Sequence, residues 1–415
     1  MDVKLPSIAS EMPSTTDVVV IGTGIVGLAS AHAIASGHPD LAVAMVEKEQ
    51  VPAFHQTGRN SGVIHSGIYY RPDSHKSKMV ADGRRLLLDL LDRHEIAHDM
   101  CGKLVVAIDH SELPRLDALE TRAAENSIPT ARLDGDGLRE IEPHIAGVAA
   151  LRVPSAGITD YTAVCRALMS EMAEMGVTFS FNTTVTGTKR QGKRTVVSTN
   201  RGDISTSTVV NCGGLHSDRV AKSAEADTAG VRIMPFRGEY FELAPAARHL
   251  VNNLVYPLPD PAFPFLGVHL TRMIDGSIHA GPNAVPALER EGYRWRDISL
   301  RDTGEIVFAA RSWKLAKRYW RTGLGEIHRS LSQRAFLAAL QRLCPELTKA
   351  DIEPAGAGVR AQAIDKSGNL LDDFAFAAGP GAVHVINAPS PAATASLAIA
   401  QTVARRHDDL IDSIS

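Results

Sequence analysis

Three glycines and one acidic residue near the start of the chain have the types and spacing needed to hold a dinucleotide. Gly22, Gly24 and Gly27 form the pattern GxGxxG, and Glu47 follows about 20 residues later. The first glycine permits a tight turn, the second lets a pyrophosphate approach the backbone, and the third lets a helix pack closely on a strand. A carboxylate at position 47 can accept hydrogen bonds from ribose hydroxyls, and it would repel a 2′-phosphate, which argues against NADP.

The elements around this pattern are those that a dinucleotide site requires. Residues 17–21 (DVVVI) are typical of a buried parallel strand, residues 28–36 of a helix, and residues 41–46 of a second strand. In such a βαβ unit the helix N-terminus presents free N–H groups to the phosphates. Further helices are expected over residues 73–96, 113–126, 162–175 and most of 301–342, and a hairpin over 195–206.

A chain of 415 residues is too long for one simple core, so two domains are expected. The last 60 residues, including GAGVRAQ, are rich in glycine and other small residues. This composition suggests that the chain returns to complete the nucleotide domain. We therefore predict an α/β fold with interleaved domains. A Rossmann-like dinucleotide-binding domain takes residues 14–80, 150–230 and 352–410, and a β-rich α+β substrate or cap domain takes residues 81–149 and 231–351.

Composition excludes several classes of protein. A net charge of −3 gives no basic field for nucleic acid. Four scattered cysteines without a CxxC pair argue against a metal or iron–sulfur site and fit a reducing compartment. Residues 1–16 lack the apolar core of a signal peptide, and no apolar run approaches a membrane span. We expect a protein that is cytoplasmic or peripheral on the inner face of the cell membrane.

The segment after Glu47 favours FAD over NAD. Residues 54–70 (FHQTGRNSGVIHSGIYY) bring small residues, polar side chains and histidines directly behind the ribose-binding strand. A flavin must be held along its ribityl chain and ring, whereas a nicotinamide dehydrogenase needs no such segment there. The alternative is an ordinary exposed loop.

Several longer blocks carry a family resemblance. RNSGVIHSGIYY (residues 59–70), PFRGEYF (235–241), FPFLGVHLTRMIDG (263–276), GPNAV (281–285), GVRAQ (358–362) and NAPSPAATAS (387–396) resemble the L-2-hydroxyglutarate dehydrogenase/oxidase family. That family belongs to the D-amino-acid-oxidase-like FAD-dependent oxidoreductases, and the resemblance runs from about residue 17 to 405. It implies oxidation of L-2-hydroxyglutarate to 2-oxoglutarate, with hydride transfer from the α carbon to flavin N5 and electron delivery to a membrane quinone or similar acceptor. The L configuration rests on the resemblance alone.

Candidate cofactor residues fall in five groups along the chain. The first three groups are Gly22, Gly24, Ile25, Val26 and Gly27, then Glu47 and Lys48, then Thr57, Gly58, Arg59, Asn60 and Ser61. The fourth group is Val185, placed where similar proteins meet the adenine, with Cys212, Gly213 and Gly214. The fifth group is Pro389, Ser390, Ala392, Ala393 and Thr394. The last group precedes a helix whose positive N-terminus can face flavin O2 and stabilise the anionic reduced flavin; the alternative there is an ordinary proline-capped helix. Some superfamily members attach FAD covalently through a histidine near position 55, but we expect non-covalent FAD with His55 as a loop residue.

Candidate substrate and catalytic residues follow from the chemistry of a hydroxy dicarboxylate. The arginine fork pairs bidentately with carboxylate, and related flavin oxidases use an arginine in the GxR context of Arg360. The candidates for substrate binding are Arg237, Tyr240, Arg272 and Arg360. Removal of the hydroxyl proton needs a base, for which His65 is the first choice and His269 the second. The alternatives are structural ion pairs for the arginines, and a core histidine or a flavin contact for His65.

Residues 311–321 combine Trp313 and Trp320 with five basic side chains. Aromatic residues interleaved with basic ones suit an anionic membrane surface, and delivery of electrons to a quinone would give this contact a purpose. A solvated basic face or an oligomer contact is the alternative.

Other functions remain open at this point. A flavin amine or amino-acid oxidase, or a glycerol-3-phosphate dehydrogenase, would share the fold, and a flavoprotein without enzymatic activity is the non-enzyme reading. The electron acceptor, the oligomeric state, covalent attachment and activity on related hydroxy acids are not determined by the sequence.

Overall fold

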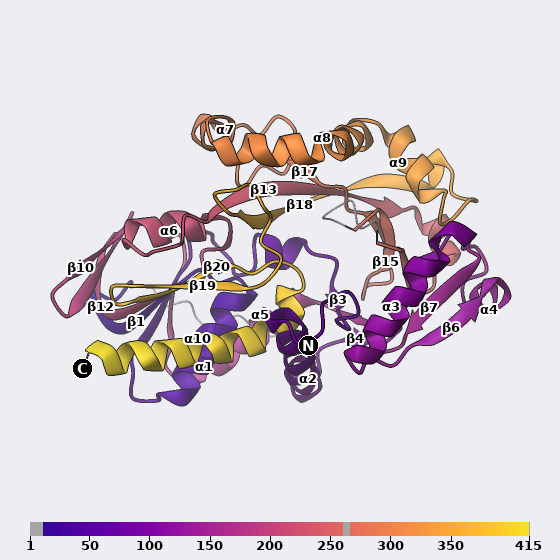
Figure 1. The fold of residues 1–415 in the computed structure, drawn as a ribbon. Helices are drawn as coiled ribbons and strands as arrows, with labels where there is room; N and C mark the ends of the chain where they lie inside the picture. Colours follow the sequence, from indigo (N-terminus) through magenta and orange to yellow (C-terminus); the bar gives the residue numbers. More distant parts are fainter. Residues whose placement is uncertain (1–10, 260–265, 415) are drawn as a thin grey trace.

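The computed structural model describes residues 11–259 and 266–414, and the chain folds around two large β-sheets (Figure 1). Residues 1–10 of the predicted N-terminal extension, and residues 263–265 of one resemblance block, lie outside the described part. No helix within the described ranges is both long and apolar enough to cross a membrane.

The first sheet carries the dinucleotide motif. Its order is β10-β11-β12-β1-β2-β9, with β20 added beside β12 and β19 beside β20. The strands are β1 (Thr15–Ile21), β2 (Val43–Val46), β9 (Thr178–Ser180), β10 (Val185–Gln191), β11 (Arg194–Thr199), β12 (Gly202–Asn211), β19 (Ala375–Gly379) and β20 (Ala382–Asn387). β1 runs parallel to both β2 and β12, and Val18, Val19 and Val20 are almost fully buried, which confirms the predicted strand.

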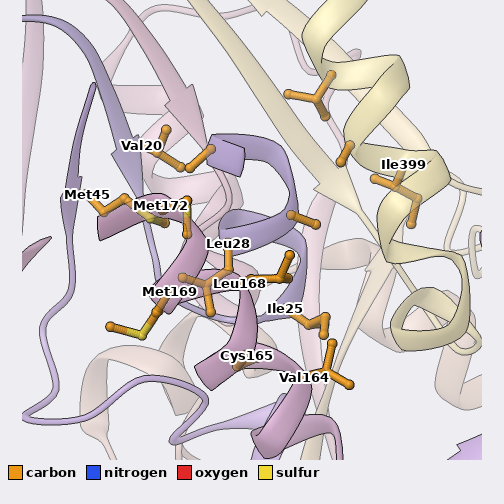
Figure 2. Packing of buried hydrophobic residues seen from close by; sticks show 14 of the residues in the cluster. Val20, Ile25, Leu28, Met45, Val164, Cys165, Leu168, Met169, Met172 and Ile399 are labelled. Carbon is orange, nitrogen blue, oxygen red and sulfur yellow. The ribbon is translucent and has the colours of Figure 1, made fainter. Parts of the chain in front are cut away.

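Helices α1 (Ile25–Gly37), α2 (His75–Arg93), α5 (Tyr161–Glu174) and α10 (Ala392–Ile414) share a core with this sheet. Figure 2 shows Leu28 of α1 among Leu168 and Met172 of α5, with Ile399 of α10 on the other side. Leu28 is fully buried, and burial of a leucine side chain stabilises a fold by roughly 1.5–3 kcal/mol. This packing fixes the first turn of α1, and with it the glycines.

The second sheet has nine strands in the order β17-β13-β16-β15-β14-β5-β7-β6, with β18 paired to β13. They are β5 (Lys103–Ala107), β6 (Ala131–Asp134), β7 (Ala149–Val153), β13 (Arg232–Leu243), β14 (Leu254–Pro257), β15 (His269–Arg272), β16 (Ile278–Gly281), β17 (Val285–Pro286) and β18 (Ile352–Ile364). A third, small sheet has the order β3-β8-β4, with β3 (Val63–Ile64), β4 (His98–Asp99) and β8 (Gly157–Thr159).

The remaining helices lie around these sheets. They are α3 (Leu113–Glu125), α4 (Gly135–Ile141), α6 (Ser217–Ser223), α7 (Leu300–Val307), α8 (Ala310–Leu331) and α9 (Gln333–Leu340). Figure 1 shows α7 and α8 along the side of β13 and β17 that faces away from the first sheet. The helices predicted near residues 73–96, 113–126, 162–175 and within 301–342, and the hairpin of β11 and β12, are confirmed.

Three predicted domain boundaries need correction. β18 pairs with β13 along its length, so residues 352–364 belong to the second sheet and not to the nucleotide domain. Helix α2 buries Leu87, Leu90 and Leu91 in the core shared with α1 and α10, so residues 81–93 belong to the nucleotide domain and not to the cap. β7, at residues 149–153, likewise belongs to the second sheet. For β18 and α2 the packing partners lie far away in the sequence, at β13 and at α1 and α10.

Candidate functional site

The glycine turn is built to keep α1 close to the end of β1. Gly22 has φ +98°, a conformation that side chains with a Cβ rarely adopt. A Cβ on Gly27 would lie 2.0 Å from the Gly22 carbonyl oxygen. A Cβ on Gly24 would have only the Thr57 hydroxyl nearby, at 3.4 Å, so its absence leaves room on the cavity side of the turn. A pyrophosphate can therefore reach the N-terminus of α1.

Glu47 is held at the end of β2 by the turn itself. One carboxylate oxygen accepts hydrogen bonds from the Thr23 backbone N–H (2.8 Å) and hydroxyl (2.9 Å), and the other accepts from the Glu49 N–H (3.0 Å). It lines a cavity of about 950 Å³, the nucleotide cavity, together with Gly22, Lys48, Val185 and Gly213. Four residues predicted for the ADP half of a dinucleotide thus gather around one space: Gly22, Gly24, Glu47 and Lys48.

A second cavity of about 490 Å³, the central cavity, begins at the same turn and extends between the two sheets. Its lining includes the predicted cofactor residues Gly24, Ile25, Val26, Gly27, Thr57, Arg59, Asn60, Ser61, Cys212, Gly214, Pro389, Ser390, Ala392 and Ala393. Gly24, Gln56, Thr57, Cys212 and Gly214 line both cavities. The two spaces therefore adjoin, as a long dinucleotide carrying a flavin requires.

Gly58 and Thr394 support this lining without being part of it. A Cβ on Gly58 would lie 2.4 Å from the Ala53 carbonyl oxygen, so glycine allows the loop to close. The buried Thr394 hydroxyl lies 2.9 Å from the Tyr161 hydroxyl and accepts a hydrogen bond from the His65 backbone N–H (3.1 Å). Thr394 thereby ties the first turn of α10 to the segment that carries His65.

Both candidate bases, His65 and His269, line the central cavity. Burial, with nearby positive charge, lowers the pKa of His65 well below its usual value, and burial lowers the pKa of His269 to about 3. His269 Nδ1 lies 2.8 Å from the Gly267 carbonyl oxygen, which fixes the tautomer with the proton on Nδ1 and leaves Nε2 as a proton acceptor. Its ring stacks on Tyr256 with centroids 3.9 Å apart. Both imidazoles are therefore neutral near pH 7.

Tyr240 and Arg360 also line the central cavity, from the adjacent strands β13 and β18. Burial lowers the pKa of the Arg360 guanidinium, although this group stays protonated at any physiological pH. Burial raises the pKa of Tyr240, so its hydroxyl stays neutral. The pair offers a planar cation and a hydroxyl donor to an anionic ligand.

The structure does not bring Arg237 and Arg272 to this cavity, which corrects two of the four predicted substrate residues. Neighbouring residues on a strand point to opposite sides, and Gly238 and Tyr240 are the β13 residues that reach the cavity. The buried Arg237 guanidinium instead donates to Glu239 (3.1 Å) and lies 4.5 Å from the Trp295 ring centre. Arg272 donates to Asp99 (3.0 Å) at the edge of the small sheet.

Several residues that escaped the sequence-based prediction lie near the cavity, Tyr69, Tyr256 and Lys103 among them. Tyr69 and Tyr256 line it, and the buried Lys103 lies against both of their rings. Tyr69 was part of the resemblance block but received no role. A lysine inside the apolar strand KLVVA was a visible irregularity, because a lysine is almost never fully buried without a reason.

His55 lies in an ionic cluster at the nucleotide cavity. Its Nδ1 is 2.6 Å from the Tyr293 hydroxyl, and its Nε2 is 2.8 Å from a Glu49 oxygen. Burial alone would raise the pKa of Glu291, but hydrogen bonds from His216 and Lys48 lower it to about 2. Glu49, His55 and Glu291 come close enough together for a metal ion, but the Lys48 ammonium already pairs with both carboxylates. The described residues therefore favour an ion-pair network here.

Comparisons with known proteins agree with this geometry. A family model described as FAD dependent oxidoreductase matches residues 17–406. L-2-hydroxyglutarate dehydrogenases from Indibacter alkaliphilus and Escherichia coli are each 44% identical to this chain, over 93% and 96% of it and 97% and 94% of their own lengths. The mitochondrial L-2-hydroxyglutarate dehydrogenase of Homo sapiens is 42% identical over 95% of this chain and 89% of its own.

Solved structures show the same fold at lower identity. The L-α-glycerophosphate oxidase of Mycoplasma pneumoniae with FAD bound has a TM-score of 0.78 at 23% identity, over 95% of each chain. Glycine oxidase from Geobacillus kaustophilus has a TM-score of 0.71 at 17% identity, over 95% of each chain. The glycine turn, the open space at Gly24 and the two adjoining cavities fit FAD as the cofactor. The chain belongs to the D-amino-acid-oxidase-like FAD-dependent oxidoreductases and, within them, to the L-2-hydroxyglutarate dehydrogenase family.

Proposed function

We propose that this protein oxidises L-2-hydroxyglutarate to 2-oxoglutarate, with hydride transfer from the substrate α carbon to flavin N5. The observation that carries the proposal is that Arg360 and two neutral histidines line the cavity that begins at the dinucleotide turn. The identity to enzymes named for this substrate, over nearly the whole chain, supports the choice of hydroxy acid.

Arg360 binds and orients the carboxylate next to the carbinol carbon. Its planar fork can make two parallel hydrogen bonds to the carboxylate, and the buried site strengthens them because water is excluded. Tyr240, beside it, donates a further hydrogen bond. With the carboxylate held by Arg360 and the hydroxyl directed at the proton acceptor, only one enantiomer can present its α hydrogen to the hydride acceptor.

His269 takes the hydroxyl proton at Nε2. The support is its tautomer, because the Gly267 carbonyl holds the ring proton at Nδ1. His65, the first choice from the sequence, shares the cavity and becomes a positioning contact in this proposal. Bound FAD supplies the hydride acceptor. The N-terminus of α10, at Ala392 and Ala393, offers a positive dipole that stabilises negative charge in the cavity.

The FAD is held non-covalently in this proposal. Both ring nitrogens of His55 have hydrogen-bond partners, and the side chain lines the nucleotide cavity and not the central one. A covalent bond to a flavin ring would require both of these features to change.

The test is to mix the purified protein anaerobically with L-2-hydroxyglutarate and follow the visible flavin absorbance. Bleaching is expected with this compound and not with D-2-hydroxyglutarate, L-glutamate or glycerol-3-phosphate. The last two controls address the amino-acid oxidase and glycerol-3-phosphate dehydrogenase alternatives. A yellow protein that is bleached only by one of the controls would keep the fold and disprove the substrate.

For the electron acceptor we propose a membrane quinone or a similar carrier, reached through an apolar and basic surface on α7 and α8. Among the exposed large apolar side chains, Trp313, Trp320 and Leu324 lie on α8, and Phe308 lies between α7 and α8. The Arg321 guanidinium lies 5.2 Å from the Trp320 ring centre. Exposed aromatic and basic side chains on one surface suit an anionic lipid headgroup layer.

The double substitution Trp320→Ala with Arg321→Ala should weaken binding to anionic liposomes by roughly tenfold, because one headgroup charge pair and one inserted ring are lost. Co-sedimentation measures the change. As a matched control, Met175→Ala with Arg85→Ala removes an exposed apolar and an exposed basic side chain from the nucleotide domain. Equal liposome binding by the wild type and both variants would remove the proposed membrane contact.

A further inference from the structure

Lys103 is buried without a carboxylate partner in the described part of the chain, unlike the other buried lysine and arginine side chains there. Four lysine or arginine side chains in the described ranges are buried, and three of them pair with a carboxylate: Lys76 with Asp372, Arg237 with Glu239, and Arg290 with Asp218. Lys103, 1% exposed, forms no ion pair with any described residue. A buried cation without a counter-ion lowers the stability of the fold, so we expect a bound ligand to supply the anion that pairs with Lys103.

Lys103 lies next to the wall of the central cavity. It lies on β5, which neighbours β14 with Tyr256 and then β15 with His269. The Lys103 Nζ atom is 4.1 Å from the Tyr256 ring centre and 5.3 Å from that of Tyr69. Tyr69, Tyr256, His65 and His269 all line the cavity, so Lys103 lies directly behind its wall.

The Tyr69 hydroxyl is a second unsatisfied group at the same place. It is buried and has no hydrogen-bond partner among the described residues. A buried hydroxyl without a partner loses its hydrogen bonds to water, and a ligand oxygen would restore one. A cation without a described counter-ion and a hydroxyl without a described hydrogen-bond partner, beside one cavity, can form a subsite for an anion.

We propose that Lys103 and the Tyr69 hydroxyl bind the second carboxylate of the substrate, at the end of the cavity away from Arg360, and so select a dicarboxylic hydroxy acid over a monocarboxylic one. This inference rests on the proposed function. Arg360 orients the carboxylate beside the reacting carbon, and Lys103 binds the second carboxylate when the substrate has one. A site built around a buried charge rejects an analogue that leaves this charge unpaired.

Among Lys103 and the four titratable side chains named around it, only Lys103 changes its charge near neutral pH. Burial lowers the pKa of Lys103 to about 7. Burial holds the pKa values of His65 and His269 far below this value and those of Tyr69 and Tyr256 far above it, so all four are neutral. Free Lys103 therefore loses its charge as the pH rises above about 7, and a bound carboxylate holds the proton on it. The Kd for L-2-hydroxyglutarate should rise with pH, by up to about tenfold per unit.

The experiment compares L-2-hydroxyglutarate with L-2-hydroxyvalerate, which has the same chain length and a methyl group in place of the second carboxylate. Anaerobic flavin reduction gives the Kd and the limiting rate constant for wild type and for Lys103→Met, whose side chain is similar in length and uncharged. The variant should bind L-2-hydroxyglutarate about 10²–10³-fold more weakly, while its reaction with L-2-hydroxyvalerate changes less than about threefold.

The outcomes separate this inference from the proposed function. If the wild type is not bleached by L-2-hydroxyglutarate, the proposed function fails. Suppose the wild type is bleached. If Lys103→Met keeps the wild-type preference for L-2-hydroxyglutarate over L-2-hydroxyvalerate, or binds both substrates more weakly by the same factor, Lys103 does not bind the second carboxylate. Should Lys103→Met fail to fold, Tyr69→Phe decides, because it removes only the hydroxyl without a described partner: an unchanged Kd for L-2-hydroxyglutarate in this variant contradicts the proposal.

Discussion

Gly27→Ala should yield a protein that retains less than about a tenth of its FAD and no measurable dehydrogenase activity. The new Cβ would lie 2.0 Å from the Gly22 carbonyl oxygen and 3.3 Å from the Cys212 Cβ. The closest contact is backbone, so it cannot be relieved by a rotamer change, and α1 must move away from β1. Overpacking of this kind costs roughly 1–3 kcal/mol, and it also carries the helix N-terminus away from the pyrophosphate. The ratio of flavin to protein absorbance measures the loss.

Two further glycines of α1 and its turn serve as comparisons. At Gly37, the last residue of the same helix, no described atom lies within 4 Å of the added Cβ, so Gly37→Ala should keep its FAD. At Gly24 the only close neighbour is the Thr57 hydroxyl, so Gly24→Ala should fold but bind FAD more weakly, since its methyl group projects toward the phosphates. Full flavin content in Gly27→Ala would show that close packing of α1 on β1 is not what holds the cofactor.

The dinucleotide site could be predicted from the sequence because its determinants are local. Gly22, Gly27 and Glu47 lie within one βαβ unit, and the turn itself holds Glu47 through the Thr23 N–H and hydroxyl. Few other arrangements of that segment would satisfy both the turn and the packing. The substrate side differs, because it is assembled from β5, β13, β14, β15 and β18, which are far apart in the chain.

Arg237 shows why the substrate side could not be predicted in the same way. The motif PFRGEYF places Arg237 and Tyr240 three residues apart, but a strand sends alternate residues to opposite sides, so only one of the two reaches the cavity. Lys103 is the converse case. The sequence shows a lysine at the start of an apolar strand, but only the pairing of β5 with β14 brings it against Tyr256. Strand register across a nine-stranded sheet cannot be read from single segments.

His269→Asn should lower the rate constant of flavin reduction by about 10²–10⁴-fold while FAD content and the Kd for 2-oxoglutarate stay near the wild-type values. The asparagine amide can still donate to the Gly267 carbonyl, which replaces the Nδ1 contact of 2.8 Å, but it offers no proton acceptor at the position of Nε2. His65→Asn should lower the rate constant by about tenfold or less, because in this assignment His65 contacts the substrate without taking its proton. Stopped-flow spectroscopy under anaerobic conditions measures both.

The pH dependence of flavin reduction provides an independent measure of the same assignment. Burial lowers the pKa of His269 to about 3, and the neutral ring is the form that accepts a proton. The rate constant at saturating substrate should therefore stay level as the pH falls from 8 to 5, whereas a base with an ordinary histidine pKa would lose activity by about tenfold per unit below pH 6. Because burial lowers the pKa values of both histidines, the variants tell them apart: a large loss in His65→Asn with a small effect of His269→Asn would assign the proton transfer to His65. A level profile with a large loss in His269→Asn places the proton acceptor on β15, across the cavity from the helix that holds the pyrophosphate.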